Sequence, residues 1–117
     1  MPFDTSVLDE AIERRSKRLE EERKRLFAQT ISLLDKHSCH FGIRSAYIFG
    51  SLAQPRRFRE HSDVDIAIET SRPELLTEAI GRFSSLLERD VDLVDLSVVP
   101  FADRIRREGV PWTPKSS

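Results

Sequence analysis

The chain has 117 residues, which is enough for one small domain with a hydrophobic core and too few for two. Its 19 Lys and Arg residues nearly balance 20 Asp and Glu residues, so the composition predicts no general attraction to nucleic acid or to acidic membranes. The single cysteine excludes an internal disulfide, no apolar run approaches the roughly 18 residues of a membrane span, and no signal-peptide pattern is present, so we expect a cytoplasmic protein.

Residues 6–40 are highly charged and contain no Gly or Pro, which predicts one long helix. Acidic residues often precede basic residues by four positions, as Glu20 precedes Lys24, and each such pair adds about 0.2–0.5 kcal/mol to helix stability. The expected boundaries are a cap at Asp4, Thr5 or Ser6 and a terminator at Gly42.

One apolar residue recurs at every seventh position of this helix, at Ile12, Leu19, Leu26 and Leu33. A narrow seven-residue seam suits the pairing of two helices. The helix is also longer than a domain of this size, so we expect it to overhang from about Arg14 to Arg25. The overhang is either a solvated helix held by its ion pairs or an arm that binds a partner or a second copy.

Three apolar runs predict strands, at residues 44–49, 64–69 and 91–96. An amphipathic helix should follow the Pro73 start signal and end near residue 89, and a short helix should cover 100–107. Val110 and Trp112 should then pack back on the body. We therefore expect an α/β (α+β) fold in one domain, 1–117, with a small mixed β-sheet, helices packed on it, a long N-terminal helix at 6–40 and a core at 44–112.

The residues that carry chemistry lie around the first two strands. Asp63 and Asp65 are two positions apart, so both side chains point to one face of a strand, where their repulsion would be relieved by a divalent metal. Gly50 leaves its backbone open to a phosphate, and Ser51 offers a hydroxyl and an N–H group at an expected helix start. By itself a D-x-D pair is more often two strand-end acids facing water.

The loop before Asp63 carries Arg56, Arg57 and Arg59, side chains that bind phosphate oxygens well but also suit a solvated loop. A structural zinc site is disfavoured, because three of its four candidate ligands crowd one helix end: the candidates are His37, Cys39, His40 and His61.

Four motifs together resemble the minimal nucleotidyltransferases, or MNT proteins, of the polymerase-beta-like nucleotidyltransferase superfamily. They are F-G-S at 49–51, S-D-V-D at 62–65, V-D-L-V-D-L at 91–96 and R-R-E-G-V at 106–110. The resemblance implies that Asp63, Asp65 and Asp92 are catalytic and bind two Mg²⁺ ions. It further implies that the nucleotide binds at Gly50, Ser51, Arg56, Arg57 and Ser62. Asp92 is preferred to Asp95 as the third carboxylate because it is the first aspartate of its motif, while Asp95 remains an alternative.

Within this family the resemblance is to MNT antitoxins, which are encoded with HEPN-type RNase toxins. It implies transfer of AMP from ATP to a toxin hydroxyl, typically of tyrosine, with the N-terminal helix helping to dock the toxin or to form an oligomer, and no direct contact with nucleic acid. A different reading, favoured by the unusual L-A-Q-P segment at 52–55, is an antitoxin that acts by binding alone. Transfer to a small molecule is the least favoured alternative, because such enzymes carry a second substrate domain.

Overall fold

The computed structural model describes residues 6–115, so the cap candidates Asp4 and Thr5 lie outside the described residues. Its elements are α1 (Ser6–Phe41), β1 (Ile43–Phe49), the 3-10 turn η1 (Gly50–Ala53), β2 (Val64–Thr70), the 3-10 turn η2 (Pro73–Leu75), α2 (Leu76–Leu87), β3 (Val91–Asp95), α3 (Ala102–Glu108) and β4 (Val110–Trp112). The expected helices and strands are all present, with ends shifted by one or two residues. The strand β4 was not predicted.

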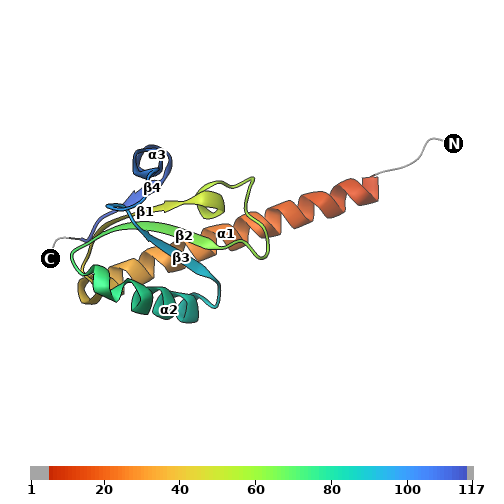
Figure 1. Ribbon diagram of the computed structural model, residues 1–117. Helices are drawn as coiled ribbons and strands as arrows, with labels where there is room; N and C mark the ends of the chain where they lie inside the picture. Colours follow the sequence, from red (N-terminus) through yellow and green to blue (C-terminus); the bar gives the residue numbers. More distant parts are fainter. Residues whose placement is uncertain (1–5, 116–117) are drawn as a thin grey trace.

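The strands form one mixed sheet in the order β3-β2-β1-β4. β1 is antiparallel to both β2 and β4, whereas β2 and β3 are parallel and are connected through α2. Helices α1 and α2 cover one face of the sheet, and α3 lies on the other (Figure 1). The expected fold class, a mixed sheet with helices and a long N-terminal helix, is confirmed.

The alternation of side chains along β2 determines which face carries the predicted carboxylates. Val64, Ile66 and Ile68 are buried in the main core beneath α1 and α2, while Ala67 belongs to the smaller cluster beneath α3. Asp65 shares its face with Ala67, because residues two apart on a strand point the same way. The candidate site therefore lies on the α3 face of the sheet.

The buried side of α1 differs from the expected seven-residue seam. Its buried residues are Leu26, Thr30, Leu34, Ser38 and Phe41, spaced by three or four positions as in a helix that lies on a globular core. Leu33 is only partly buried. The Thr30 hydroxyl donates a hydrogen bond of 2.8 Å to the Leu26 carbonyl, so this polar side chain is satisfied within the helix.

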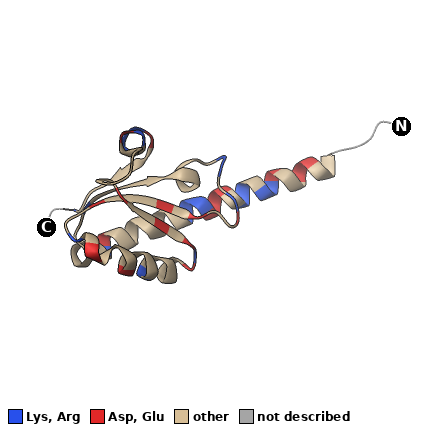
Figure 2. Cartoon of the chain, viewed as in Figure 1, with Lys and Arg blue, Asp and Glu red and all other residues tan. Residues whose placement is uncertain are grey.

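The first part of α1 projects beyond the rest of the molecule (Figure 1). Residues 6–18 are exposed throughout, and the molecule measures 66 × 28 × 26 Å. We call residues 6–18 the α1 arm. The expected overhang, from about Arg14 to Arg25, was therefore wrong at both ends: the exposed segment already includes residues 6–13, and Leu19 packs against the core. Acidic and basic bands alternate along the arm and the residues that follow (Figure 2). Glu20 pairs with Arg23 at 2.6 Å rather than with Lys24.

Within 6–115, no helix is long and apolar enough to cross a membrane.

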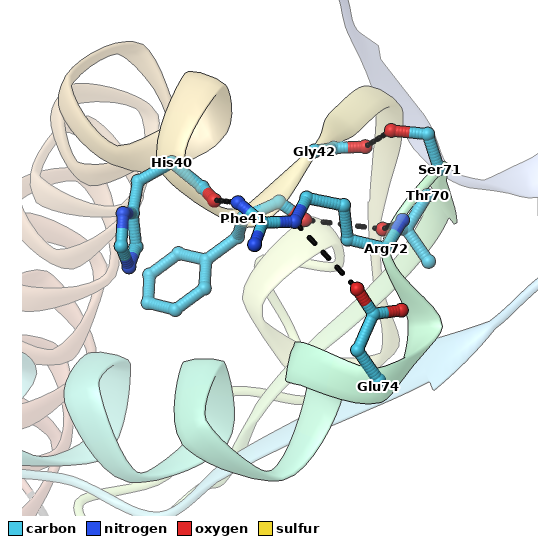
Figure 3. Close-up of polar contacts among 7 residues, drawn as sticks. All are labelled: His40, Phe41, Gly42, Thr70, Ser71, Arg72 and Glu74. Atoms are coloured by element: carbon cyan, nitrogen blue, oxygen red, sulfur yellow. Dashed lines mark hydrogen bonds and ion pairs between the residues drawn. The ribbon is translucent and has the colours of Figure 1, made fainter.

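The C-terminal end of α1 is fixed by the segment that follows β2 (Figure 3). Gly42 ends the helix with a positive φ of 66°. The carbonyls of His40, Phe41 and Gly42 accept hydrogen bonds from Arg72 Nη1, Thr70 Oγ1 and the Ser71 backbone N–H, at 2.9, 3.1 and 2.9 Å. The last carbonyls of the helix, which have no partner within it, are thus satisfied by tertiary contacts.

Two glycines of this fold should respond oppositely to alanine. Gly42→Ala should lower the free energy of unfolding by about 1–2 kcal/mol, because alanine is strained at positive φ and its Cβ would lie 2.7 Å from Arg72 and Ser71 side-chain atoms. Gly81→Ala should raise it by about 0.5–1 kcal/mol, because Gly81 lies within α2 with open space around it. Urea unfolding measures both; equal effects would contradict the assigned role of Gly42.

Candidate active site

Asp65 and Asp92 lie opposite each other on the parallel strands β2 and β3. Asp63 is exposed and directly precedes β2. Burial, followed by the negative charges of Asp92 and then of Asp63, raises the pKa of Asp65 to about 6. All three carboxylates are thus close enough to act on one another electrostatically, and Asp65 is at the centre of that interaction.

The Gly50–Ser51 turn lies against this carboxylate group. Phe49, the last residue of β1, pairs with Asp65, so the chain turns into η1 immediately beside it. Gly50 has a positive φ of 69°, and a Cβ added there would overlap the Asp65 carboxylate. Only glycine lets the backbone pass this close to Asp65 in this conformation. Ser51 follows within η1, which is a single short turn.

The two predicted phosphate-binding arginines lie in different places. Arg57 lines a cavity of about 290 Å³ together with Gly50 and residues of α3. Arg56 lines a hollow of about 560 Å³ whose other wall is α1, including Arg15 and Leu19. The structure therefore brings Arg57, but not Arg56, into the cavity that Gly50 lines.

Ser62 and Asp95 have structural partners. The Ser62 hydroxyl accepts a hydrogen bond of 2.7 Å from the Arg59 backbone N–H, which closes the turn before Asp63. Asp95 lies opposite Ile68, and its side chain points to the other face of the sheet from that of Asp92. It accepts hydrogen bonds from the Ser97 N–H and hydroxyl at 2.9 and 2.8 Å. This geometry gives Asp95 a turn-forming role and leaves Asp92 as the neighbour of Asp65.

Two arginines that sequence reasoning missed hold the loops of the site. Arg23 of α1 donates a hydrogen bond of 2.9 Å to the Leu52 carbonyl in η1. Arg89 donates one of 2.9 Å to the Ser62 carbonyl, forms an ion pair of 2.8 Å with Glu22 and lies 5.3 Å from the centre of the Phe58 ring. No local pattern could have revealed these contacts, because each joins residues that are distant in the sequence.

Removing the Arg89 side chain should loosen the loop before Asp63. We expect Arg89→Ala to lower the free energy of unfolding by about 1–3 kcal/mol, because the half-buried Ser62 carbonyl and the Glu22 carboxylate would lose their partner. Arg82→Ala, at an exposed position of α2, should change it by less than about 0.5 kcal/mol. Urea unfolding of the two variants provides the comparison, and matching losses would contradict this role of Arg89.

The carboxylates are suitable ligands for Mg²⁺, but they do not form a complete coordination shell by themselves. Among residues 6–115, no group of three or more His, Cys, Asp or Glu side chains is placed to hold a metal ion. Mg²⁺, however, commonly takes one or two protein carboxylates and completes its octahedron with waters and substrate phosphates. Asp65 and Asp92 offer such a pair, and the repulsion that raises the Asp65 pKa is what a cation relieves.

This fold and site geometry agree with comparisons to known proteins. Residues 28–112 match the family described as polymerase beta, nucleotidyltransferase. The chain therefore belongs to the polymerase beta nucleotidyltransferase family, as the motifs predicted. No curated protein was similar enough to count as a relative.

Several solved structures have a fold similar to that of this chain. A chain of a toxin–antitoxin complex with AMP-PNP has a TM-score of 0.60 and 26% identity, covering 73% of this chain and 74% of that one. A chain of the MntA-HepT toxin–antitoxin pair has a TM-score of 0.54 and 24% identity, covering 77% and 72%. A structure described as a minimal nucleotidyltransferase has a TM-score of 0.56 and 22% identity, covering 83% and 95%. The last two show the fold alone; together with the motifs they match the minimal nucleotidyltransferases.

Proposed function

We propose that this protein is an antitoxin that uses ATP to transfer AMP to the hydroxyl group of a tyrosine on a HEPN-type RNase toxin.

 The observation that carries the proposal is the Asp65–Asp92 pair beside the Gly50–Ser51 turn, in a chain of the nucleotidyltransferase family. The similarity to a toxin–antitoxin complex with AMP-PNP supports both the nucleotide and the kind of partner.

In this reaction the acceptor oxygen forms a bond to the α-phosphorus of ATP, the bond from that phosphorus to the bridging oxygen breaks, and pyrophosphate leaves. Mg²⁺ held by Asp65 and Asp92, with Asp63 nearby, would supply charge neutralisation on the phosphates. Asp92 is the exposed member of the pair. In the proposed reaction it accepts the hydroxyl proton, which then passes on to solvent. The Gly50 backbone leaves room for the phosphates, and Ser51 offers its hydroxyl and N–H group to them.

The direct test is incubation with labelled ATP, Mg²⁺ and the protein encoded next to this one. The partner should become labelled and lose its RNase activity, and an Asp63→Asn/Asp65→Asn double variant should abolish both effects. A partner that is tightly inhibited but never labelled would overturn the proposal.

The α1 arm is proposed to help dock the toxin. Its exposed large apolar residues are Val7, Leu8 and Ile12, with 73%, 58% and 55% of their surface accessible. We expect Leu8→Glu/Ile12→Glu to weaken partner binding about tenfold or more, because charge would enter a desolvated contact. Because these side chains touch little of the core, the urea midpoint should not change. Ala11→Glu, on the same exposed segment, is the charge control. Unchanged partner affinity in the double variant would exclude the arm from the interface.

Neutralisation by binding alone is the second candidate. It is favoured by the unusual L-A-Q-P segment at 52–55 and by the long, exposed α1 arm. The labelling experiment separates it from the enzyme, because the Asp63→Asn/Asp65→Asn variant would then neutralise the partner as well as the unmodified protein does. Turnover on a small hydroxylated acceptor without any protein partner would instead support the least favoured alternative.

A further inference from the structure

The cavity of about 290 Å³ that Gly50 and Arg57 line has a composition that the carboxylate site does not explain. One wall is the end of β1 and η1, and the other is α3. We call it the α3 pocket and define it by Phe49, Gly50, Arg57, Phe101, Arg104 and Ile105. Because Gly50 also abuts the Asp65 carboxylate, the pocket opens directly beside the site of the proposed chemistry.

Its lining combines apolar surface with two arginines, and Gln54 and Glu108 complete it. Ile105 is buried and Phe49 partly buried, whereas 47% of the Phe101 surface is exposed at the start of α3. An aromatic ring left this open beside a concave apolar surface is suited to receive another flat ring.

Two arginines stand at the rim of the α3 pocket. Arg57 donates a hydrogen bond of 3.2 Å to Gln54 Oε1, and Arg104 forms an ion pair of 3.1 Å with Glu108. Both arginines are exposed, and each of these contacts uses one nitrogen of the guanidinium group. The remaining N–H groups can therefore bind an anion that approaches from the carboxylate side. A flat ring joined to an anionic chain matches this arrangement.

We propose that the α3 pocket holds the nucleoside part of the nucleotide, with its base on the Phe101 ring and its phosphates leading past Arg57 to the Gly50–Ser51 turn. This inference rests on the proposed nucleotidyltransferase function and deepens it, because it assigns the base to a surface built by this small chain alone. Arg104 then faces the sugar and the phosphates from the α3 side.

The test compares a ligand with a base and one without. Titration calorimetry in Mg²⁺ measures AMP-PNP and tripolyphosphate binding to the full chain. Phe101→Ala should weaken AMP-PNP about 5- to 100-fold, the range for losing one base stack, and should leave tripolyphosphate affinity within about twofold. Phe101→Trp should restore AMP-PNP binding, because it keeps an aromatic surface. Val98→Ala, which removes an apolar side chain that is 75% exposed, is the control and should change neither affinity.

A second pair of variants tests the anionic end. Arg57→Ala should weaken both ligands, whereas Arg82→Ala, at an exposed position of α2 outside the pocket, should change each by less than about twofold. Circular dichroism checks that the variants are folded.

Four results would overturn the assignment. Unchanged AMP-PNP affinity in Phe101→Ala would place the base elsewhere and leave the proposed function intact. Unchanged AMP-PNP affinity together with weaker partner binding would show that the pocket receives the partner. If the unmodified protein binds tripolyphosphate and AMP-PNP equally, no base subsite exists; if it binds neither and still neutralises its partner, the proposed enzymatic function fails as well.

Discussion

Asp65→Asn should abolish transfer while making the metal-free protein more stable. The amide keeps the shape of the carboxylate but removes the negative charge on which Mg²⁺ and phosphate positioning depend, so we expect a loss of about 100-fold or more in transfer rate. In the absence of metal, however, that same charge is repelled by Asp92 and Asp63 and is partly buried. Function and stability are therefore expected to change in opposite directions.

The stability gain should depend on pH in a defined way. The pKa of Asp65 is raised from 3.8 to about 6 in the folded protein, so the native state binds this proton more tightly than the unfolded state does. The free energy of unfolding contributed by this group is thus highest below about pH 4, falls as pH rises through about 6, and is constant above. At pH 8 without metal, Asp65→Asn should be more stable by about 1–2 kcal/mol, a value reduced for the partial exposure of the group.

Urea unfolding at pH 4, 6 and 8 in a chelator measures this effect, and labelled-ATP transfer measures the rate. Asp92→Asn should also lose transfer, whereas Asp95→Asn should retain it, because its amide oxygen can still accept both hydrogen bonds from Ser97. An Asp65→Asn variant that is less stable than the unmodified protein at pH 8 would contradict the repulsion among these carboxylates. Loss of transfer in Asp95→Asn alone would assign the third carboxylate to Asp95.

Gly50→Ala should have the second largest effect, because it acts on backbone and site together. Alanine at φ 69° costs about 1–2 kcal/mol, and its Cβ would displace the Asp65 carboxylate. A displacement of about 1 Å in a positioning group can cost about 100-fold in rate. We therefore expect both a lower free energy of unfolding and a loss of transfer of about that size.

A second substitution at the same position separates the two causes. Asn tolerates positive φ better than alanine does, so Gly50→Asn should regain part of the stability. It still carries a Cβ, so transfer should remain low. Urea unfolding and labelled-ATP transfer provide the two measurements. Recovery of transfer in Gly50→Asn would show that backbone strain, not the contact with Asp65, explains the glycine.

The sequence by itself determined the local elements of this protein. Charge without Gly or Pro predicted α1, and apolar runs predicted β1, β2 and β3. The positive φ of Gly42 agrees with its expected role as a helix terminator. These features were predictable because they depend on neighbours within a few residues. β4 was missed because it has only three residues and includes Pro111, which a strand tolerates at the edge of a sheet, where β4 lies.

The tertiary structure decided what lies beside these elements. Sheet register places Asp92, but not Asp95, opposite Asp65. Arg56 and Arg57 line different hollows although they are adjacent in the chain. Contacts between distant segments also determine which face of α1 is buried and which carbonyls accept the hydrogen bonds of Arg23 and Arg89. The same is true of the α3 pocket. Residue pattern fixes which face a side chain can occupy, whereas its partners are fixed only when the strands and helices pack together.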